Sequence, residues 1–194
     1  IIINPPKKYK SLGFTRIMSG KYEEAIDDCK KALELDPNNA KTYSDLGFAY
    51  TLSGRYEDAI ESCLRAISID SESADAYYWL GYAYHDMGNY KKAIETYQNV
   101  LKIDSQYANA YFELGNIYAV LNEYEDAISF YNEALKIEPN DGITYNQLGT
   151  AYLKLERNTE AIDSFSNSIR IENNWEVPYQ NLGDTYLNLG KYEE

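Results

Sequence analysis

The chain has 194 residues and a formal net charge of −13, and 25% of its residues are charged. Affinity for nucleic acid depends mainly on clustered Lys and Arg, so an acidic surplus of this size argues against a nucleic-acid ligand. No apolar run in the sequence is long enough to span a membrane.

Residues 1–5 precede a regular pattern, and we interpret them as the remnant of a preceding unit or a leader. From residue 6 onward, a Leu-Gly pair recurs every 34 residues with no insertion or deletion, first at Leu12-Gly13 and last at Leu182-Gly183. A fixed period in this range is typical of a repeat array in which each unit packs only on its neighbours. The predicted units are 6–39, 40–73, 74–107, 108–141 and 142–175, followed by the first helix of an incomplete sixth unit at 176–194.

Each unit predicts two amphipathic helices. Counted from the first residue of a unit, positions 4, 7, 8 and 11 form one helical stripe, and positions 20, 21, 24, 27 and 28 form a second. Turn signals such as Ser53-Gly54 separate the two helices, and segments such as Asp36-Pro37-Asn38-Asn39 end one unit and cap the next. Gly at position 8 and Ala at position 20 are small, so we expect the paired helices to approach closely.

These columns resemble the tetratricopeptide repeat family over nearly the whole chain. The departures are Tyr in place of Trp at position 4, and Pro retained only at Pro37 and Pro139 of the five positions where the family has it. The resemblance implies an all-α fold, a right-handed superhelical α-solenoid of antiparallel helix pairs.

The resemblance also implies that first helices line a concave groove and that positions 2, 5, 9, 12 and 13 face the ligand. Read along the chain, this face begins basic, becomes aromatic and ends rich in amides. An alternative stays open, in which the aromatic residues at position 9 only pack against the neighbouring first helix. The candidate groove residues are Lys7, Lys10, Phe14, Lys41, Phe48, Tyr78, Tyr82, His85, Phe112, Asn116, Asn146 and Lys154.

Members of the family that bind chaperone tails hold the terminal carboxylate with a set of Lys, Asn and Arg residues at fixed positions. Only Lys10 matches that set. The other four positions hold Phe14, Asp45, Asp75 and Trp79, so chaperone-tail binding is not supported.

No catalytic or metal-binding constellation is evident, and we expect neither an enzyme nor a cofactor. His85 is the one histidine, and a metal site made with Asp75 and Asp86 would be a poor one. Cys29 and Cys63 both occupy position 24 of adjacent units, about one helix spacing apart, which is too far for a disulfide. Free buried thiols lean mildly towards a reducing compartment, so we expect a cytoplasmic location.

The leading hypothesis is a non-catalytic scaffold whose groove binds an extended peptide or a partner helix. Two alternatives are a structural module that self-associates end to end, and a targeting or regulatory domain of a larger enzyme. The last helix would leave Leu182, Tyr186 and Leu189 uncovered, which fits either a fragment of a longer array or head-to-tail docking. Acidic pairs such as Glu57-Asp58 have two interpretations, stabilisation of the helix start or a docking surface for a basic partner.

Overall fold

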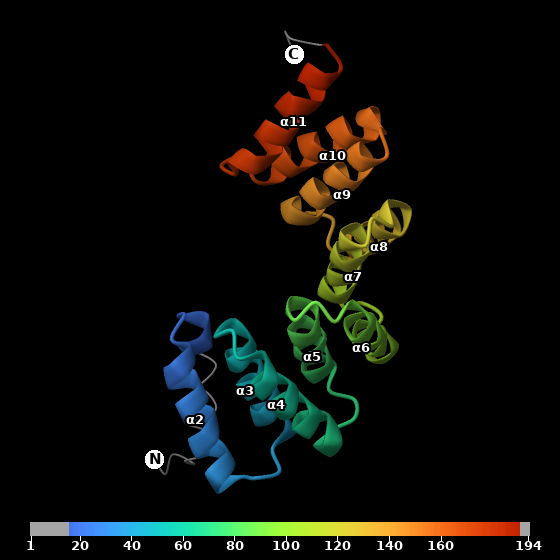
Figure 1. The fold of residues 1–194 in the computed structure, drawn as a ribbon. Helices are drawn as coiled ribbons and strands as arrows, with labels where there is room; N and C mark the ends of the chain where they lie inside the picture. Colours follow the sequence, from blue (N-terminus) through green and yellow to red (C-terminus); the bar gives the residue numbers. More distant parts are fainter. Residues whose placement is uncertain (1–15, 191–194) are drawn as a thin grey trace. The chain divides into compact units, whose positions relative to one another are not determined.

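The structure is a computed structural model that describes residues 16–190, and every regular element in this range is an α-helix (Figure 1). The first helices of the units are α3 (Ala40–Leu52), α5 (Ala74–Asp86), α7 (Ala108–Val120), α9 (Gly142–Lys154) and α11 (Glu176–Asn188). The second helices are α2 (Tyr22–Leu35), α4 (Tyr56–Ile69), α6 (Tyr90–Ile103), α8 (Tyr124–Ile137) and α10 (Asn158–Ile171). Consecutive helices pack in pairs, which confirms the predicted all-α architecture of helix pairs.

Two of the predicted capping residues, Asn39 and Asp141, cap first helices with their side chains. The Asn39 side chain accepts a hydrogen bond from the Thr42 backbone N–H at 2.9 Å, and Asp141 caps α9 through Ile143 and Thr144. The second helices α2, α4, α8 and α10 carry carboxylates in the first turn, such as Glu57 in α4, where they offset the positive end of the helix dipole.

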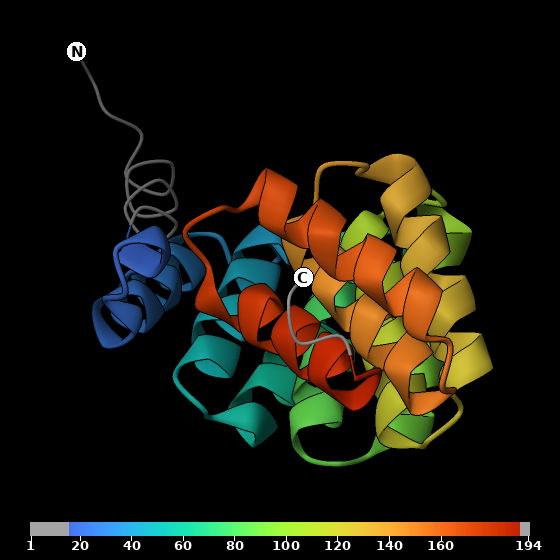
Figure 2. The ribbon, with the colours of Figure 1, turned by 90° about the horizontal axis from the view of Figure 1, so that it is seen from above.

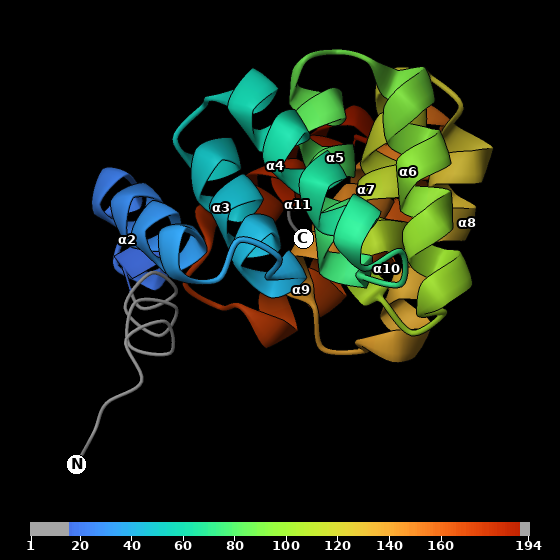
Figure 3. The same cartoon turned by 90° about the horizontal axis from the view of Figure 1, so that it is seen from below.

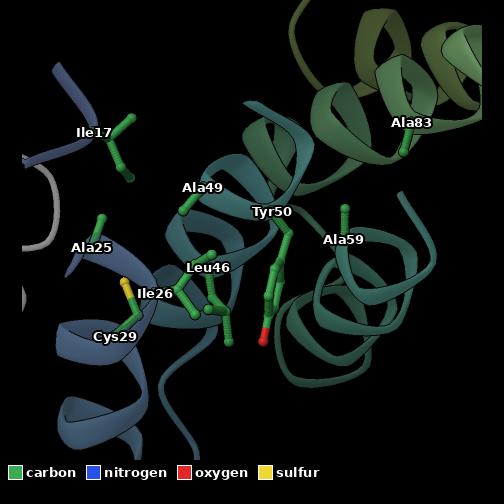
Figure 4. Close-up of a cluster of buried hydrophobic side chains, with 9 residues drawn as sticks. All are labelled: Ile17, Ala25, Ile26, Cys29, Leu46, Ala49, Tyr50, Ala59 and Ala83. Atoms are coloured by element: carbon green, nitrogen blue, oxygen red, sulfur yellow. The ribbon is translucent and has the colours of Figure 1, made fainter. Parts of the chain in front are cut away.

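The chain divides into two compact parts, residues 1–105 and 106–194, and each is described by itself. In the N-terminal part, α3 packs between α2 and α4, and α5 packs on α4 and α6 (Figures 1 and 2). Its core includes small side chains, such as Ala49 and Ala59, beside larger ones (Figure 4). The buried members of this core are Ile17, Ala25, Ile26, Cys29, Leu46, Ala49, Tyr50, Ala59 and Ala83.

In the C-terminal part, α9 packs on α8 and α10, and α11 packs on α10 (Figure 3). Its core brings together α8 and α9 and includes predicted stripe positions of both, such as Tyr131 and Leu148, together with Ala151 at the unpredicted position 10. The buried members are Ala127, Ile128, Tyr131, Leu135, Leu148 and Ala151. Partly buried aromatic side chains of α7 and α9, among them Phe112 and Tyr145, cover this core.

Close approach within a helix pair depends on the glycine at position 8. A Cβ atom added to Gly149 would lie 2.6 Å from Cε1 of Phe165, whose side chain is fully buried. Gly81 faces the ring of Tyr97 in the same way, with a Cβ-to-Cε1 distance of 2.9 Å. At Gly183, by contrast, nothing lies within 4 Å of the added atom.

This contrast predicts opposite effects of one substitution at equivalent positions. Gly149→Ala should lower the free energy of unfolding by about 1–3 kcal/mol, because the buried Phe165 ring has nowhere to move. Gly183→Ala should raise it by about 0.5–1 kcal/mol, because alanine favours the helix and meets no neighbour. Urea unfolding followed by circular dichroism measures both. Equal effects at the two sites would show that the glycine contact does not govern pair packing.

The turn between the two helices of a pair needs a left-handed residue at position 15. Gly88 has φ of +73°, and the Asn89 N–H then donates to the Tyr84 carbonyl at 2.8 Å to close the end of α5. In later units the same conformation is held by Asn122, with φ of +64°, and by Glu156, with φ of +58°. A side chain in this region is strained, and glutamate more so than asparagine.

Glu156→Gly should therefore raise the free energy of unfolding by about 1 kcal/mol, because it relieves the left-handed strain. Asn122→Gly should give a smaller gain, and Gly88→Ala should cost a similar amount in the opposite direction. Guanidinium unfolding of the three variants tests the order. A loss of stability in Glu156→Gly would contradict it.

Candidate protein-binding face

Within each part, neighbouring first helices touch while neighbouring second helices stay apart. In the N-terminal part α3 contacts α5, and in the C-terminal part α9 contacts both α7 and α11. Among the described residues, no comparable contact joins α4 to α6 or α8 to α10. Within each part, successive repeats are therefore farther apart on the side of the second helices than on the side of the first helices. We call the surface of the first helices that points away from the second helices the inner face of each part.

In the N-terminal part, aromatic side chains from α3 and α5 form a connected cluster. The Phe48 ring stacks on Trp79, with centroids 3.9 Å apart and planes 15° apart. Trp79 is followed along α5 by Tyr82 at 6.0 Å, and Tyr82 by His85 at 6.4 Å. We call Phe48, Trp79, Tyr82 and His85 the aromatic cluster, and all four are partly exposed.

Two site residues predicted from the sequence, Tyr78 and Phe48, pack mainly against other side chains of the protein. Tyr78 is 7% exposed and packs against Trp79 and Tyr97, so most of its surface belongs to the core. Phe48 packs against the neighbouring first helix, as one of the two interpretations of position 9 expected, and its role in binding stays a prediction. Trp79 was not among the predicted site residues. Its place at position 6, beside position 9 of the preceding unit, was the signal that could have found it.

Lys41 lies at the start of α3 and is already paired within the chain. Its Nζ atom lies 3.2 Å from Asp45 and 3.1 Å from Asp75 of the next first helix. Burial alone would lower the pKa of Lys41, but the two carboxylates outweigh that effect and raise it. Lys41 is therefore a permanent cation that ties α3 to α5 on the inner face.

His85 lies where the aromatic cluster meets the turn after α5. Burial lowers its pKa, and the nearby carboxylate of Asp86 opposes that shift. Asp86 also accepts a hydrogen bond of 2.9 Å from the hydroxyl of Tyr56 on α4. The residues that the structure describes contain no group of three metal-binding side chains.

In the C-terminal part, the predicted amides bond to other side chains of the chain. Asn116 accepts a hydrogen bond of 2.9 Å from the Tyr131 hydroxyl and donates one of 3.2 Å to Glu113. Asn146 is 4% exposed and accepts one of 2.9 Å from Asn181 of the following first helix. These amides therefore hold neighbouring helices in register.

The other predicted residues differ in exposure. Phe112 is partly buried against the core of the C-terminal part, with its ring 6.0 Å from Tyr131, and Lys154 is exposed at the end of α9. Lys7, Lys10 and Phe14 lie outside the described residues.

The two cysteines offer no nucleophile. Both are free and buried, and burial raises the pKa of each thiol to about 12. A thiol that stays protonated at neutral pH neither attacks a substrate nor oxidises readily. None of the described helices has the length and apolar character needed to cross a bilayer.

A stack of helix pairs with a partly exposed inner face defines a class of repeat protein that serves as a scaffold for other proteins. Family models described as TPR repeat match residues 17–54, 49–88 and 81–121. Models described as tetratricopeptide repeat match residues 108–141, 130–163 and 178–194. The chain belongs to the tetratricopeptide repeat family, whose members are generally non-catalytic interaction scaffolds.

Solved structures agree with this assignment. A crystal structure of MamA is 34% identical, covers 83% of this chain and 94% of its own, and superposes with a TM-score of 0.72. YrrB, described as a TPR protein with an unusual peptide-binding site, is 22% identical over 89% of both chains, with a TM-score of 0.68. PilF of Pseudomonas aeruginosa shares the fold at 17% identity, with a TM-score of 0.84 over 97% of this chain and 87% of its own. No curated protein sequence matches the chain.

The lowered pKa of His85 predicts how stability depends on pH. The folded chain binds a proton at His85 less readily than the unfolded chain, so protonation favours unfolding. The free energy of unfolding should therefore fall as the pH drops from about 7.5 to about 5.5, through the ordinary histidine pKa of about 6.5.

Because His85 is the one histidine in the sequence, His85→Gln should flatten this dependence. Denaturant unfolding of the two proteins at both pH values provides the measurement. A pH dependence that survives unchanged in His85→Gln would assign it to other groups.

Proposed function

We propose that the inner faces bind an extended peptide or a partner helix, and that the chain is a scaffold with no catalysis of its own. The observation that carries the proposal is the aromatic cluster, in which partly exposed rings from two helices meet on a rigid surface. Aromatic side chains on a preformed surface supply much of the binding energy of protein interfaces at a small cost in conformational entropy. The description of YrrB as a peptide-binding member of the same fold supports this reading.

Several expectations are part of the same proposal. The repeat boundaries are kept at 6–39, 40–73, 74–107, 108–141, 142–175 and 176–194, which agree with first helices that begin at Ala40, Ala74, Ala108, Gly142 and Glu176. The binding residues are those predicted from the sequence, with Trp79 added. A cytoplasmic location is supported by the two free buried thiols.

Self-association is the second candidate, and exposed apolar side chains on α11 and at its C-cap, Leu189, favour it. Leu187 is 53% exposed and Leu189 is 41% exposed, and Gly183 has no neighbour within 4 Å of an added Cβ. Sedimentation across a concentration series separates this candidate from the first. A species that stays monomeric at high concentration removes self-association and leaves peptide binding in place.

The peptide-binding proposal is tested with short peptides selected from a random display library against the whole chain. Tyr82→Ala and Phe112→Ala should each weaken a selected peptide by about 2 kcal/mol, as truncated hot-spot residues do. Glu61→Ala, an exposed change on the second helix α4, is the matched control and should leave affinity unchanged. Titration calorimetry gives the affinities, and circular dichroism checks that each variant is folded.

Two results would count against the proposal. Failure to select any peptide would reject peptide binding outright. Loss of affinity in Glu61→Ala, with none in Tyr82→Ala or Phe112→Ala, would place the binding surface on the second helices.

A further inference from the structure

A pocket of about 660 Å³ lies in the C-terminal part, where α10 ends and α9 and α11 begin. Its apolar walls are Ile143 in the first turn of α9, Ile171 at the end of α10, and Trp175 immediately before α11. Glu172, Asn173 and Asn174 complete the lining. Ile143 is 48% exposed, so one wall is open to a ligand.

Trp175 stands at a position where helix formation favours a small capping residue and not a tryptophan. It is the N-cap residue of α11 and makes no capping hydrogen bond with its side chain. Of the equivalent residues in other units, Asn39 and Asp141 cap their helices, whereas Ser73 and Tyr107 make no capping hydrogen bond with their side chains. Replacing a capping side chain costs about 1 kcal/mol. The Trp175 ring therefore adds no capping bond to α11, and it forms a wall of the pocket instead.

The walls of the pocket are held in place. The Ser168 hydroxyl donates a hydrogen bond of 2.7 Å to the Gly142 carbonyl, and this bond joins the last turn of α10 to the first residue of α9. The Glu172 side chain lies against the same point, since a Cβ added to Gly142 would be 3.0 Å from its Cγ. Binding here would require little reorganisation.

The electrostatic surroundings of the pocket favour a cation. Glu172 is exposed in the lining, and Glu176 lies in the first turn of α11. The carbonyl end of α10 adds negative potential and the amide ends of α9 and α11 add positive potential, so the carboxylates of Glu172 and Glu176 are the groups that favour a cation. Arg170 is the basic residue in the last turn of α10, but its guanidinium donates to Asn167 at 3.3 Å and does not line the pocket.

We propose that this pocket binds an Arg or Lys side chain of the peptide partner. The aliphatic stem of such a residue would pack on Ile143 and Ile171, as long basic side chains do on apolar surfaces. Its charge would lie on the Trp175 ring and beside the Glu172 carboxylate, which combines a cation–π contact with a charge-assisted hydrogen bond. This inference rests on the proposed function and names the chemistry of the partner at one subsite.

The experiment uses the unaltered chain, and comparison with Trp175→Phe shows which part of a change in tryptophan fluorescence comes from Trp175 and which from Trp79. Peptides selected from the random display library against the whole chain are the probes. We expect a recurrent Arg or Lys among them, a change in Trp175 fluorescence on binding, and an affinity that falls with added salt. Replacing that basic residue by citrulline, which is uncharged, should weaken binding by about tenfold or more.

Variants of the chain locate the effect. Glu172→Gln and Trp175→Leu should each reduce affinity for the basic peptide by about tenfold while leaving its citrulline analogue nearly unaffected. Asp163→Asn removes an exposed carboxylate from α10 more than two turns before the pocket and should change neither affinity. Circular dichroism shows whether each variant retains its helices.

The outcomes separate this inference from the proposed function. If peptides bind with loss in Tyr82→Ala but not in Glu172→Gln or Trp175→Leu, the pocket inference is wrong and the proposed function stands. A recurrent Leu or Phe anchor that depends on Trp175 but not on Glu172 also overturns it, because the pocket would then take an apolar side chain. Failure to select any peptide rejects both.

Discussion

The contact between a glycine in the first helices α3, α5, α7 and α9 and the position-24 side chain of the partner helix is the constraint on which the rest of the structure depends. Gly81 meets the Tyr97 ring and Gly149 meets the Phe165 ring, each at a distance that leaves no room for a Cβ. The two helices of a pair are thereby fixed close together, and successive pairs can meet through their first helices while the second helices remain separate. The inner face is therefore a consequence of how each pair packs.

The sequence predicted the fold well because every important contact joins residues within one unit or the next. A local contact repeated at each period leaves a column of identical residues, and such columns can be read without knowing the structure. The helices α3 and α9 begin at Ala40 and Gly142, the first residues of predicted units. The columns were less informative at position 15, where Asn122 and Glu156 adopt the left-handed conformation that glycine holds elsewhere.

The candidate site was harder to predict, because a position in the repeat fixes the face of a helix but not the depth of a side chain. Tyr78 and Asn146 share a repeat position on the ligand-facing side, yet both are buried by neighbours on the next helix or within their own pair. Trp79 and Trp175 were missed for the complementary reason. Neither position belongs to the expected ligand-facing set. The Phe48 ring that stacks on Trp79 belongs to the preceding unit, and Trp175 lines a pocket with Ile143 and Ile171 of its own unit.

The two interpretations of the acidic pairs are compatible. Stabilisation of the helix start acts within the first turn, whereas attraction of a basic partner acts at longer range. A carboxylate such as Glu57 in the first turn of a helix stabilises that helix, but its negative charge still contributes to the field around the protein. Several of the cations are already committed to carboxylates of the chain, as Lys41 is to Asp45 and Asp75. Such internal ion pairs leave the net charge of −13 unchanged, and this charge can attract a basic partner from a distance. Such a field raises the rate of encounter without selecting a sequence, so selectivity has to come from short-range features such as the aromatic cluster.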